Sequence, residues 1–147
     1  MKCDNKSIGK YISILYRYQQ CFMGKELKKY GLGTGQYIFL LILFKKDGIS
    51  QDELSKSAYI DKGTTARAIA KLENEGYVLR KKDEEDKRTN RIYLTEKALE
   101  FKPVLFKILR KWLDVLSADL NKEEEEVAIE LLEKMGESAA KYMKENN

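Results

Sequence analysis

The longest apolar run in the chain comprises the eight residues from Tyr37 to Phe44, and it restricts the possible folds more than any other feature. The run is much shorter than a membrane-spanning helix requires. Because it is apolar on nearly all sides, we expect a helix over about residues 34–46 that other elements surround. Before it, residues 7–29 carry apolar side chains at three- and four-residue spacing, which predicts an amphipathic helix. The chain is therefore expected to be built mainly of helices around a central buried one.

Two short helices joined by a brief connection are predicted after the apolar run. Ser50 and Glu53 form a capping-box pattern that opens a helix over about residues 51–57. Asp61 is a favourable N-cap for a helix that ends near Glu75, before a glycine. Two helices with this spacing indicate a helix-turn-helix.

A charged hairpin is predicted next. Residues 77–81 and 91–94 carry the β-branched and aromatic side chains of two strands. The segment between them, residues 82–90, is almost wholly charged or polar and must therefore lie outside the core. The predicted fold class is mainly α with a small β-hairpin wing, that is, a winged helix-turn-helix.

Two long helices complete the predicted fold. One begins after Thr95 and runs to about residue 117, with Pro103 expected to kink it. The other is capped by Asn121 and Glu124. We expect a single domain over residues 1–147, with the winged part at about 34–95 and N- and C-terminal dimerisation helices at about 7–30 and 96–145.

The apolar stripes of the first and last helices suggest contact with a second copy of the chain. A winged part of this size can complete its hydrophobic core without these stripes. Exposed apolar stripes usually contact a partner. The alternative is that the two stripes pack on each other within one chain. The residues predicted at a homodimer interface are Ile8, Ile12, Leu15, Leu131, Met135 and Tyr142.

Composition argues against an enzyme. The chain has no histidine, and its two cysteines, Cys3 and Cys21, do not have the spacing of a metal site. No nucleophile–base pair or phosphate-binding loop is recognisable, so we expect neither catalysis nor a cofactor nor a metal. No signal peptide or membrane segment is recognisable either, and we expect a cytoplasmic protein.

The charge distribution is compatible with a polyanionic partner. The net charge is +4, whereas residues 121–147 alone hold eight acidic and four basic side chains. The body of the chain is therefore mildly basic, which permits binding to nucleic acid.

The second helix of the helix-turn-helix carries the main candidates for contact with double-stranded DNA. Its N-terminal half would enter the major groove, where Arg67 could read a guanine and threonine hydroxyls could meet phosphates or bases. A solvated helix face is the alternative, but no acidic residue lies between Lys62 and Lys71. The predicted contacts on this helix are Lys62, Thr64, Thr65, Arg67 and Lys71, with Ser50 and Gln51 at the start of the preceding helix.

The hairpin supplies a second set of candidates. Arg88 near its tip could enter the minor groove, where negative potential is concentrated. The four acidic residues 83–86 instead favour a solubilising loop, so charge alone supports both interpretations equally. The predicted wing contacts are Arg80, Lys82, Asp86, Lys87, Arg88 and Arg91.

The two motifs together resemble the multiple antibiotic resistance regulator (MarR) family. Asp86 and Arg88, followed by Leu94 and Thr95, resemble the family's wing signature, and residues 61–78 resemble its recognition helix and the strand after it. The resemblance implies a homodimer with a winged domain on each side and Arg88 in the minor groove. It also implies a response to small phenolic or anionic ligands; a subgroup of the family senses oxidants through cysteine.

An effector site is only weakly indicated. Arg17 could meet a carboxylate, and Tyr37 and Trp112 could line a cavity, although aromatic residues at helical spacing are more often plain core. Cys21 could sense redox state, but a buried inert thiol is the simpler interpretation. The sequence therefore predicts a ligand-responsive repressor that binds an inverted-repeat operator as a homodimer. The alternative is a winged-helix protein–protein interaction module without DNA binding.

Overall fold

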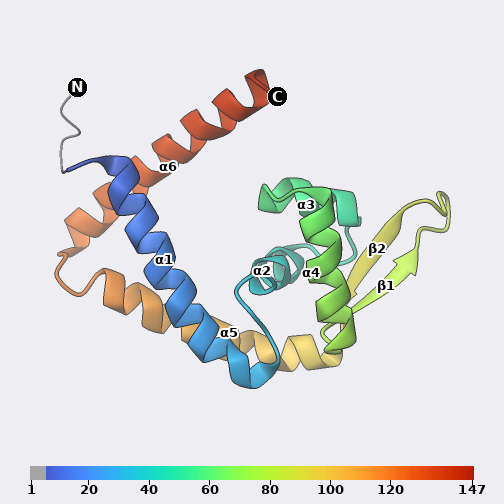
Figure 1. Cartoon of the computed structure of the whole chain (residues 1–147). Helices are drawn as coiled ribbons and strands as arrows, with labels where there is room; N and C mark the ends of the chain where they lie inside the picture. The colour runs from blue at the N-terminus through green and yellow to red at the C-terminus, as the bar shows by residue number, and fades with distance from the viewer. Residues whose placement is uncertain (1–5) are drawn as a thin grey trace. The chain divides into compact units, whose positions relative to one another are not determined.

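A computed structural model describes residues 6–147 of the chain, and it confirms a mainly helical fold with one hairpin. The chain divides into two compact units, one that ends at Leu109 and one that begins at Arg110. No helix of the described part is long and apolar enough to cross a membrane. The elements are α1 (Ile8–Leu27), η1 (Lys28–Tyr30), α2 (Tyr37–Lys45), α3 (Gln51–Ala58), α4 (Lys62–Asn74), β1 (Val78–Lys82), β2 (Asn90–Leu94), α5 (Glu96–Leu116) and α6 (Lys122–Glu145) (Figure 1).

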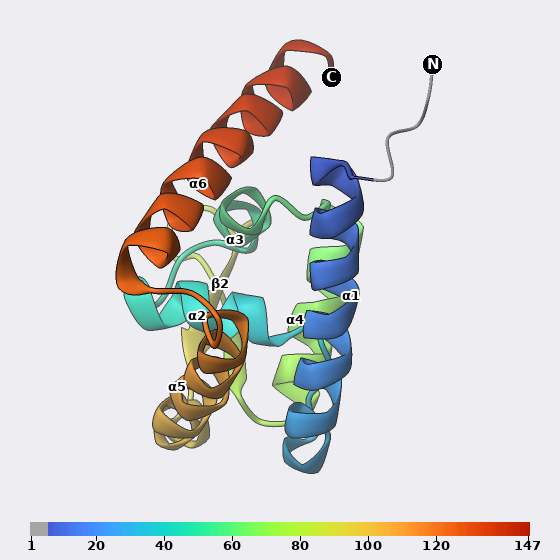
Figure 2. The ribbon, with the colours of Figure 1, turned by 90° about the vertical axis from the view of Figure 1, so that its left-hand side faces the viewer.

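Helix α2 lies at the centre of the first unit, as the apolar run predicts. Phe39 and Leu40 are fully buried in it, and Leu43 nearly so. In both Figure 1 and Figure 2, α2 lies across the directions of α1 and α4. Buried side chains from the elements around it form one continuous core, which includes Met23, Leu27, Leu54, Ile69, Leu72, Tyr77, Ile92 and Leu105.

Helix α2 begins at Tyr37 rather than near residue 34, and a side chain explains the later start. Gln36 turns its amide oxygen back to accept a hydrogen bond from the Gly33 N–H at 2.7 Å. This bond stabilises a turn that occupies residues 34–36. A side chain that bonds to nearby backbone in this way competes with helix formation.

The hairpin is anchored to the helical core by a third extended segment. β1 and β2 pair antiparallel, with Val78 opposite Leu94 and Lys82 opposite Asn90. On the other edge of β2, Ile92 bonds through its carbonyl to the Gly48 N–H and through its N–H to the Ile49 carbonyl, each at 3.0 Å. Gly48 has a φ of +73°, and a Cβ there would lie 2.8 Å from the Tyr93 ring. The chain therefore needs glycine at this close approach.

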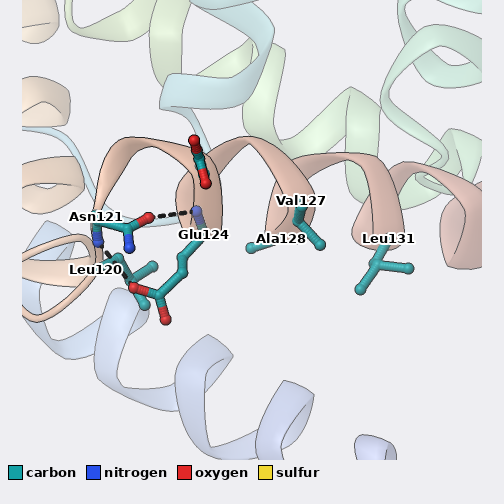
Figure 3. Close-up of a pocket in the computed structure, with 7 residues that line it drawn as sticks. Leu120, Asn121, Glu124, Val127, Ala128 and Leu131 are labelled. Carbon is teal, nitrogen blue, oxygen red and sulfur yellow. Dashed lines mark hydrogen bonds between the residues drawn. The ribbon is translucent and has the colours of Figure 1, made fainter.

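The second unit consists of the end of α5 and the whole of α6. The predicted cap of α6 is confirmed in both directions, because Asn121 accepts from the Glu124 N–H at 2.8 Å and Glu124 accepts from the Asn121 N–H at 3.1 Å (Figure 3). Beside this cap lies a pocket whose apolar lining comes from Leu120, Val127, Ala128 and Leu131. Apolar side chains are thus presented to solvent along the first turns of α6.

Candidate nucleic-acid interface

The N-terminus of α4 is fixed by Asp61, as the capping pattern predicts. Its carboxylate accepts the Thr64 N–H at 2.8 Å and the Thr64 hydroxyl at 2.7 Å. These bonds from Thr64, first from its N–H and then from its hydroxyl, lower the pKa of Asp61 below its ordinary value. The negative charge nearest this helix end is therefore engaged by the helix itself.

The same threonine orients Arg67. One guanidinium nitrogen of Arg67 donates to the Thr64 hydroxyl oxygen at 3.1 Å, one turn closer to the helix start. A Cβ at Gly63 would lie 3.5 Å from the Arg67 Nη1 atom, which is an ordinary van der Waals contact, so the arrangement does not depend on glycine at this position. Lys62 and Thr64 are exposed beside it. The exposed start of α4 thus presents two cations, one of which is already oriented in the free protein.

Two of the predicted contacts on the helix-turn-helix, Ser50 and Gln51, are wholly or partly buried, whereas Lys71 is exposed. Ser50 is the N-cap of α3, where its hydroxyl accepts the Glu53 N–H at 3.1 Å, and it is only 8% exposed. Gln51 is half-buried. At the far end of α4, the ammonium group of Lys71 lies beside Gly33, 3.9 Å from where a Cβ would be.

Thr65 requires a correction. It is predicted to touch DNA, but its side chain is fully buried and its hydroxyl has no hydrogen-bond partner. Thr65 precedes Ala68, Ile69 and Leu72 by three, four and seven residues, which places it on the apolar face of α4. Thr65 therefore packs on the buried face of α4 and cannot reach DNA that contacts the exposed face of the helix.

The hairpin loop is held by Asp83, a residue that was not among the predicted contacts. Its carboxylate accepts the Arg91 Nε–H at 2.6 Å and the backbone N–H groups of Glu85 and Asp86 at 2.9 and 3.4 Å. The N–H of Glu85 contributes most to lowering the pKa of Asp83, followed by Arg91. Arg91 in turn donates to the Gly48 carbonyl at 3.0 Å, which ties the loop to the turn before α3. The wing is therefore fixed to the helical core at its base.

Asp86 also faces into the loop. It accepts the Arg88 N–H at 3.0 Å and the Thr89 hydroxyl at 3.3 Å. Two of the four consecutive acidic side chains are thus used to shape the loop, and Glu84 and Glu85 remain exposed. Lys82, Lys87 and Arg88 are exposed on the same hairpin. The exposed part of the wing therefore carries both signs of charge, with Lys82, Lys87 and Arg88 beside Glu84, Glu85 and Asp86.

The remaining wing arginines are turned toward the protein. Arg91 holds Asp83, and this bond raises its pKa further above the ordinary value. Arg80 lies 3.8 Å from the Glu73 carboxylate, with its Nε buried and without a hydrogen-bond partner. Both arginines join β-strands to neighbouring elements, so their first role is to position the hairpin.

Comparison with known proteins decides the family. The sequence model described as the MarR family matches residues 34–89. The HTH-type transcriptional regulator BilQ of Clostridium symbiosum is 30% identical over 133 residues, which cover 90% of this chain and 92% of the relative. The chain belongs to the MarR family. It is accordingly a MarR-family transcriptional regulator, and the prediction that it is not an enzyme is confirmed by these relatives.

Solved structures agree with the assignment to MarR. A MarR transcriptional regulator from Methanosarcina mazei Go1 is similar with a TM-score of 0.88 and 45% identity, covering 95% of this chain and 94% of that one. A putative MarR family regulator from Listeria monocytogenes, solved in complex with a 26mer DNA, has a TM-score of 0.87 and 27% identity, with 97% of each chain covered. The winged helix-turn-helix is thereby confirmed as the fold.

Several predicted residues of this MarR chain lie outside the α4–wing surface. Arg17 is exposed on α1 and donates to the Ser13 hydroxyl, whereas Tyr37 is buried and its hydroxyl accepts from Gln19 at 3.3 Å. Trp112 is 9% exposed and belongs to the second unit. Cys21 is exposed rather than buried, and Cys3 lies outside the described residues. An effector site built from Arg17, Tyr37 and Trp112 stays a prediction.

The predicted dimer residues are mostly accessible in the single MarR chain. Ile8, Ile12 and Leu15 on α1 are 65, 46 and 47% exposed. On α6, Leu131 and Tyr142 are 51 and 64% exposed, and Met135 is half-buried. Their contact with a second copy stays a prediction, but large apolar side chains this accessible are what such a contact requires.

Burial of the Thr65 hydroxyl gives a stability prediction for this MarR chain. We expect Thr65→Val to raise the free energy of unfolding by about 1 kcal/mol, because it removes a buried hydroxyl without a partner and keeps the shape. Chemical denaturation followed by circular dichroism measures this change. Thr64→Val is the matched control, since it removes the hydroxyl bonds to Asp61 and Arg67, keeps the N–H bond to Asp61 and should lower stability. A lower stability of Thr65→Val would show that the hydroxyl has a partner after all.

Proposed function

We propose that this MarR-family chain binds double-stranded DNA sequence-specifically, as a homodimer on an inverted repeat, and acts as a ligand-responsive repressor. The observation that carries the proposal is the exposed start of α4, where Asp61 and Thr64 hold Arg67 in place. A guanidinium oriented before binding loses less freedom when it makes two hydrogen bonds to a guanine. The relative from Listeria monocytogenes that was solved with a 26mer DNA also supports DNA as the partner.

The wing adds contacts to the DNA backbone in this proposal. Arg88 would enter the minor groove, and Lys82 and Lys87 would lie near phosphates. The bonds of Asp83 and Asp86 keep two acidic side chains turned into the loop. The Arg91 guanidinium offsets the charge of Asp83, which lowers the repulsion between this acidic residue and DNA phosphates.

The homodimer in this proposal rests on the exposed apolar residues of α1 and α6. An inverted repeat matches the two-fold symmetry of a dimer, with one recognition helix for each half-site. Release by a small phenolic or anionic effector is proposed together with this, and the exposed Arg17 offers a cation to an anionic ligand.

The direct test is a fluorescence-anisotropy titration of labelled duplex DNA of random sequence with the purified protein at about 50 mM salt. Non-specific binding of a dimer with several phosphate contacts should be measurable at this ionic strength. Absence of binding to any duplex under these conditions would exclude DNA as the partner and would favour a protein–protein module.

A further inference from the structure

Tyr59 has an unusual backbone conformation at the turn between α3 and α4. Its φ is +56°, and it is the non-glycine residue with positive φ in the described part of the chain. This left-handed conformation brings the Cβ of an ordinary residue too close to the following carbonyl oxygen. A bulky residue in this conformation indicates a candidate functional position, because strained backbone conformations occur most often at functional sites.

The turn itself imposes this conformation. The Tyr59 N–H donates to the Lys56 carbonyl at 3.2 Å, and the Ile60 N–H donates to the Ser55 carbonyl at 3.1 Å. The Ser55 hydroxyl closes the turn by donating to the Ile60 carbonyl at 2.9 Å. Ile60 also packs against the hydrophobic core. Any residue at position 59 must therefore adopt positive φ, and glycine would do so most easily.

Among residues 6–147, the side chain of Tyr59 has no hydrogen-bond or ring partner that could offset the strain. It is 85% exposed, more than any other large hydrophobic side chain of the described residues. Its hydroxyl makes no hydrogen bond to a described residue, and its ring takes part in no aromatic or cation–π pair among residues 6–147. A partner outside the chain would account for both the exposure and the retained strain.

The surroundings of Tyr59 fit the sugar–phosphate backbone. The turn leads directly into the start of α4, where Lys62 and Arg67 are exposed, and Lys56 is exposed on the other side. The first negative charge after the turn is the Asp61 carboxylate. It accepts hydrogen bonds from the N–H and the hydroxyl of Thr64. Tyrosine hydroxyls are among the groups that donate hydrogen bonds to DNA phosphates.

We propose that the Tyr59 hydroxyl donates a hydrogen bond to a DNA phosphate beside the groove that α4 occupies. The proposal rests on the proposed DNA-binding function and adds a contact to it. Because the phenol is uncharged, it fixes the position of the helix without releasing a counterion.

Two substitutions separate the hydroxyl from the backbone strain. Tyr59→Gly removes the side chain and relieves the strain, so its melting temperature should equal that of the wild type or exceed it by up to about 3 °C. Tyr59→Phe keeps the ring and the strain and loses only the hydroxyl, so its melting temperature should be unchanged. Both variants should bind a duplex selected from a random pool by the wild type roughly two- to tenfold more weakly.

The salt dependence of binding distinguishes this contact from that of a cation. The slope of log affinity against log salt should stay the same in both Tyr59 variants, whereas Lys62→Ala, as a comparison, should make it shallower. Wild-type affinity in either variant overturns the proposal, and so does a changed slope. If the wild type itself binds no duplex, the proposed DNA function fails; if it binds and the variants bind equally well, only the role of Tyr59 fails.

Discussion

Raising the salt concentration from 50 to 200 mM should weaken binding of duplex DNA by this chain about 10³- to 10⁵-fold. The exposed cations Lys62, Lys82, Lys87 and Arg88 occur in each subunit. Two copies of these four side chains supply eight positive charges, within the range of roughly six to ten phosphate contacts from which an effect of this size follows. Each contact releases counterions from DNA, and the gain from that release disappears as salt is added. Anisotropy titrations at four or five salt concentrations measure the slope.

Arg88→Ala tests whether the wing contributes to the salt dependence of DNA binding. Arg88 in the minor groove also neutralises phosphate charge, so removing this cation from each subunit of a dimer should reduce the slope by about two, and in a monomer by about one. Lys141→Ala is a matched control, because Lys141 is an exposed cation on α6 and lies outside the proposed DNA-binding surface of α4 and the wing. A slope unchanged by Arg88→Ala would remove the wing from the proposed contact surface.

Ile12→Asp should convert the dimer to a monomer and weaken binding to an inverted repeat by about 10²- to 10⁴-fold. Ile12 is 46% exposed, so a carboxylate there is tolerated by the single chain but not in an apolar contact between two chains. The loss in affinity is large because the second half-site is no longer bound from within the same complex. Sedimentation equilibrium reports the oligomeric state, and anisotropy reports the affinity.

Leu99→Asp is the control for this substitution. Leu99 is 55% exposed in the first turn of α5, at the end of the predicted C-terminal dimerisation segment that adjoins the winged part, and it is not among the predicted interface residues. It should leave both the oligomeric state and the affinity unchanged, and circular dichroism should show native helix content in both variants. A dimeric Ile12→Asp protein with full affinity would contradict the proposed role of α1.

Features set by local sequence could be predicted well. The caps at Ser50, Asp61 and Asn121 depend on a side chain and an N–H three residues later, and all three form as expected. The central position of α2 follows from its apolar composition, because no other arrangement buries such a run. The extent of the hairpin differs from the prediction by only one residue at the ends of its strands.

Assignments based on polarity alone were less reliable. The hydroxyl of Thr65 predicts a contact with DNA, whereas its spacing to Ile69 and Leu72 indicates the buried face. The helical period was the better signal, and it was available in the sequence. The charge of Arg91 likewise predicts a contact with DNA, although its guanidinium donates to Asp83 across the hairpin loop.

Other features depend on backbone geometry that the sequence does not show. The orientation of Asp83 and Asp86 into the loop follows from the turn that connects β1 to β2. The positive φ of Tyr59 arises from hydrogen bonds on both sides of the turn, and a tyrosine gives no local signal for it. These contacts determine how the cations of the wing and of α4 are presented.

Selection of bound sequences from a random duplex pool tests the central claim most directly. Two recognition helices related by two-fold symmetry should enrich an inverted repeat whose half-sites are centred about one helical turn, 10–10.5 base pairs, or a multiple of it apart. The same selection with Arg67→Ala should keep the symmetry and lose preference at one base pair in each half-site. Enrichment of no sequence, or of a single half-site without symmetry, would contradict the account.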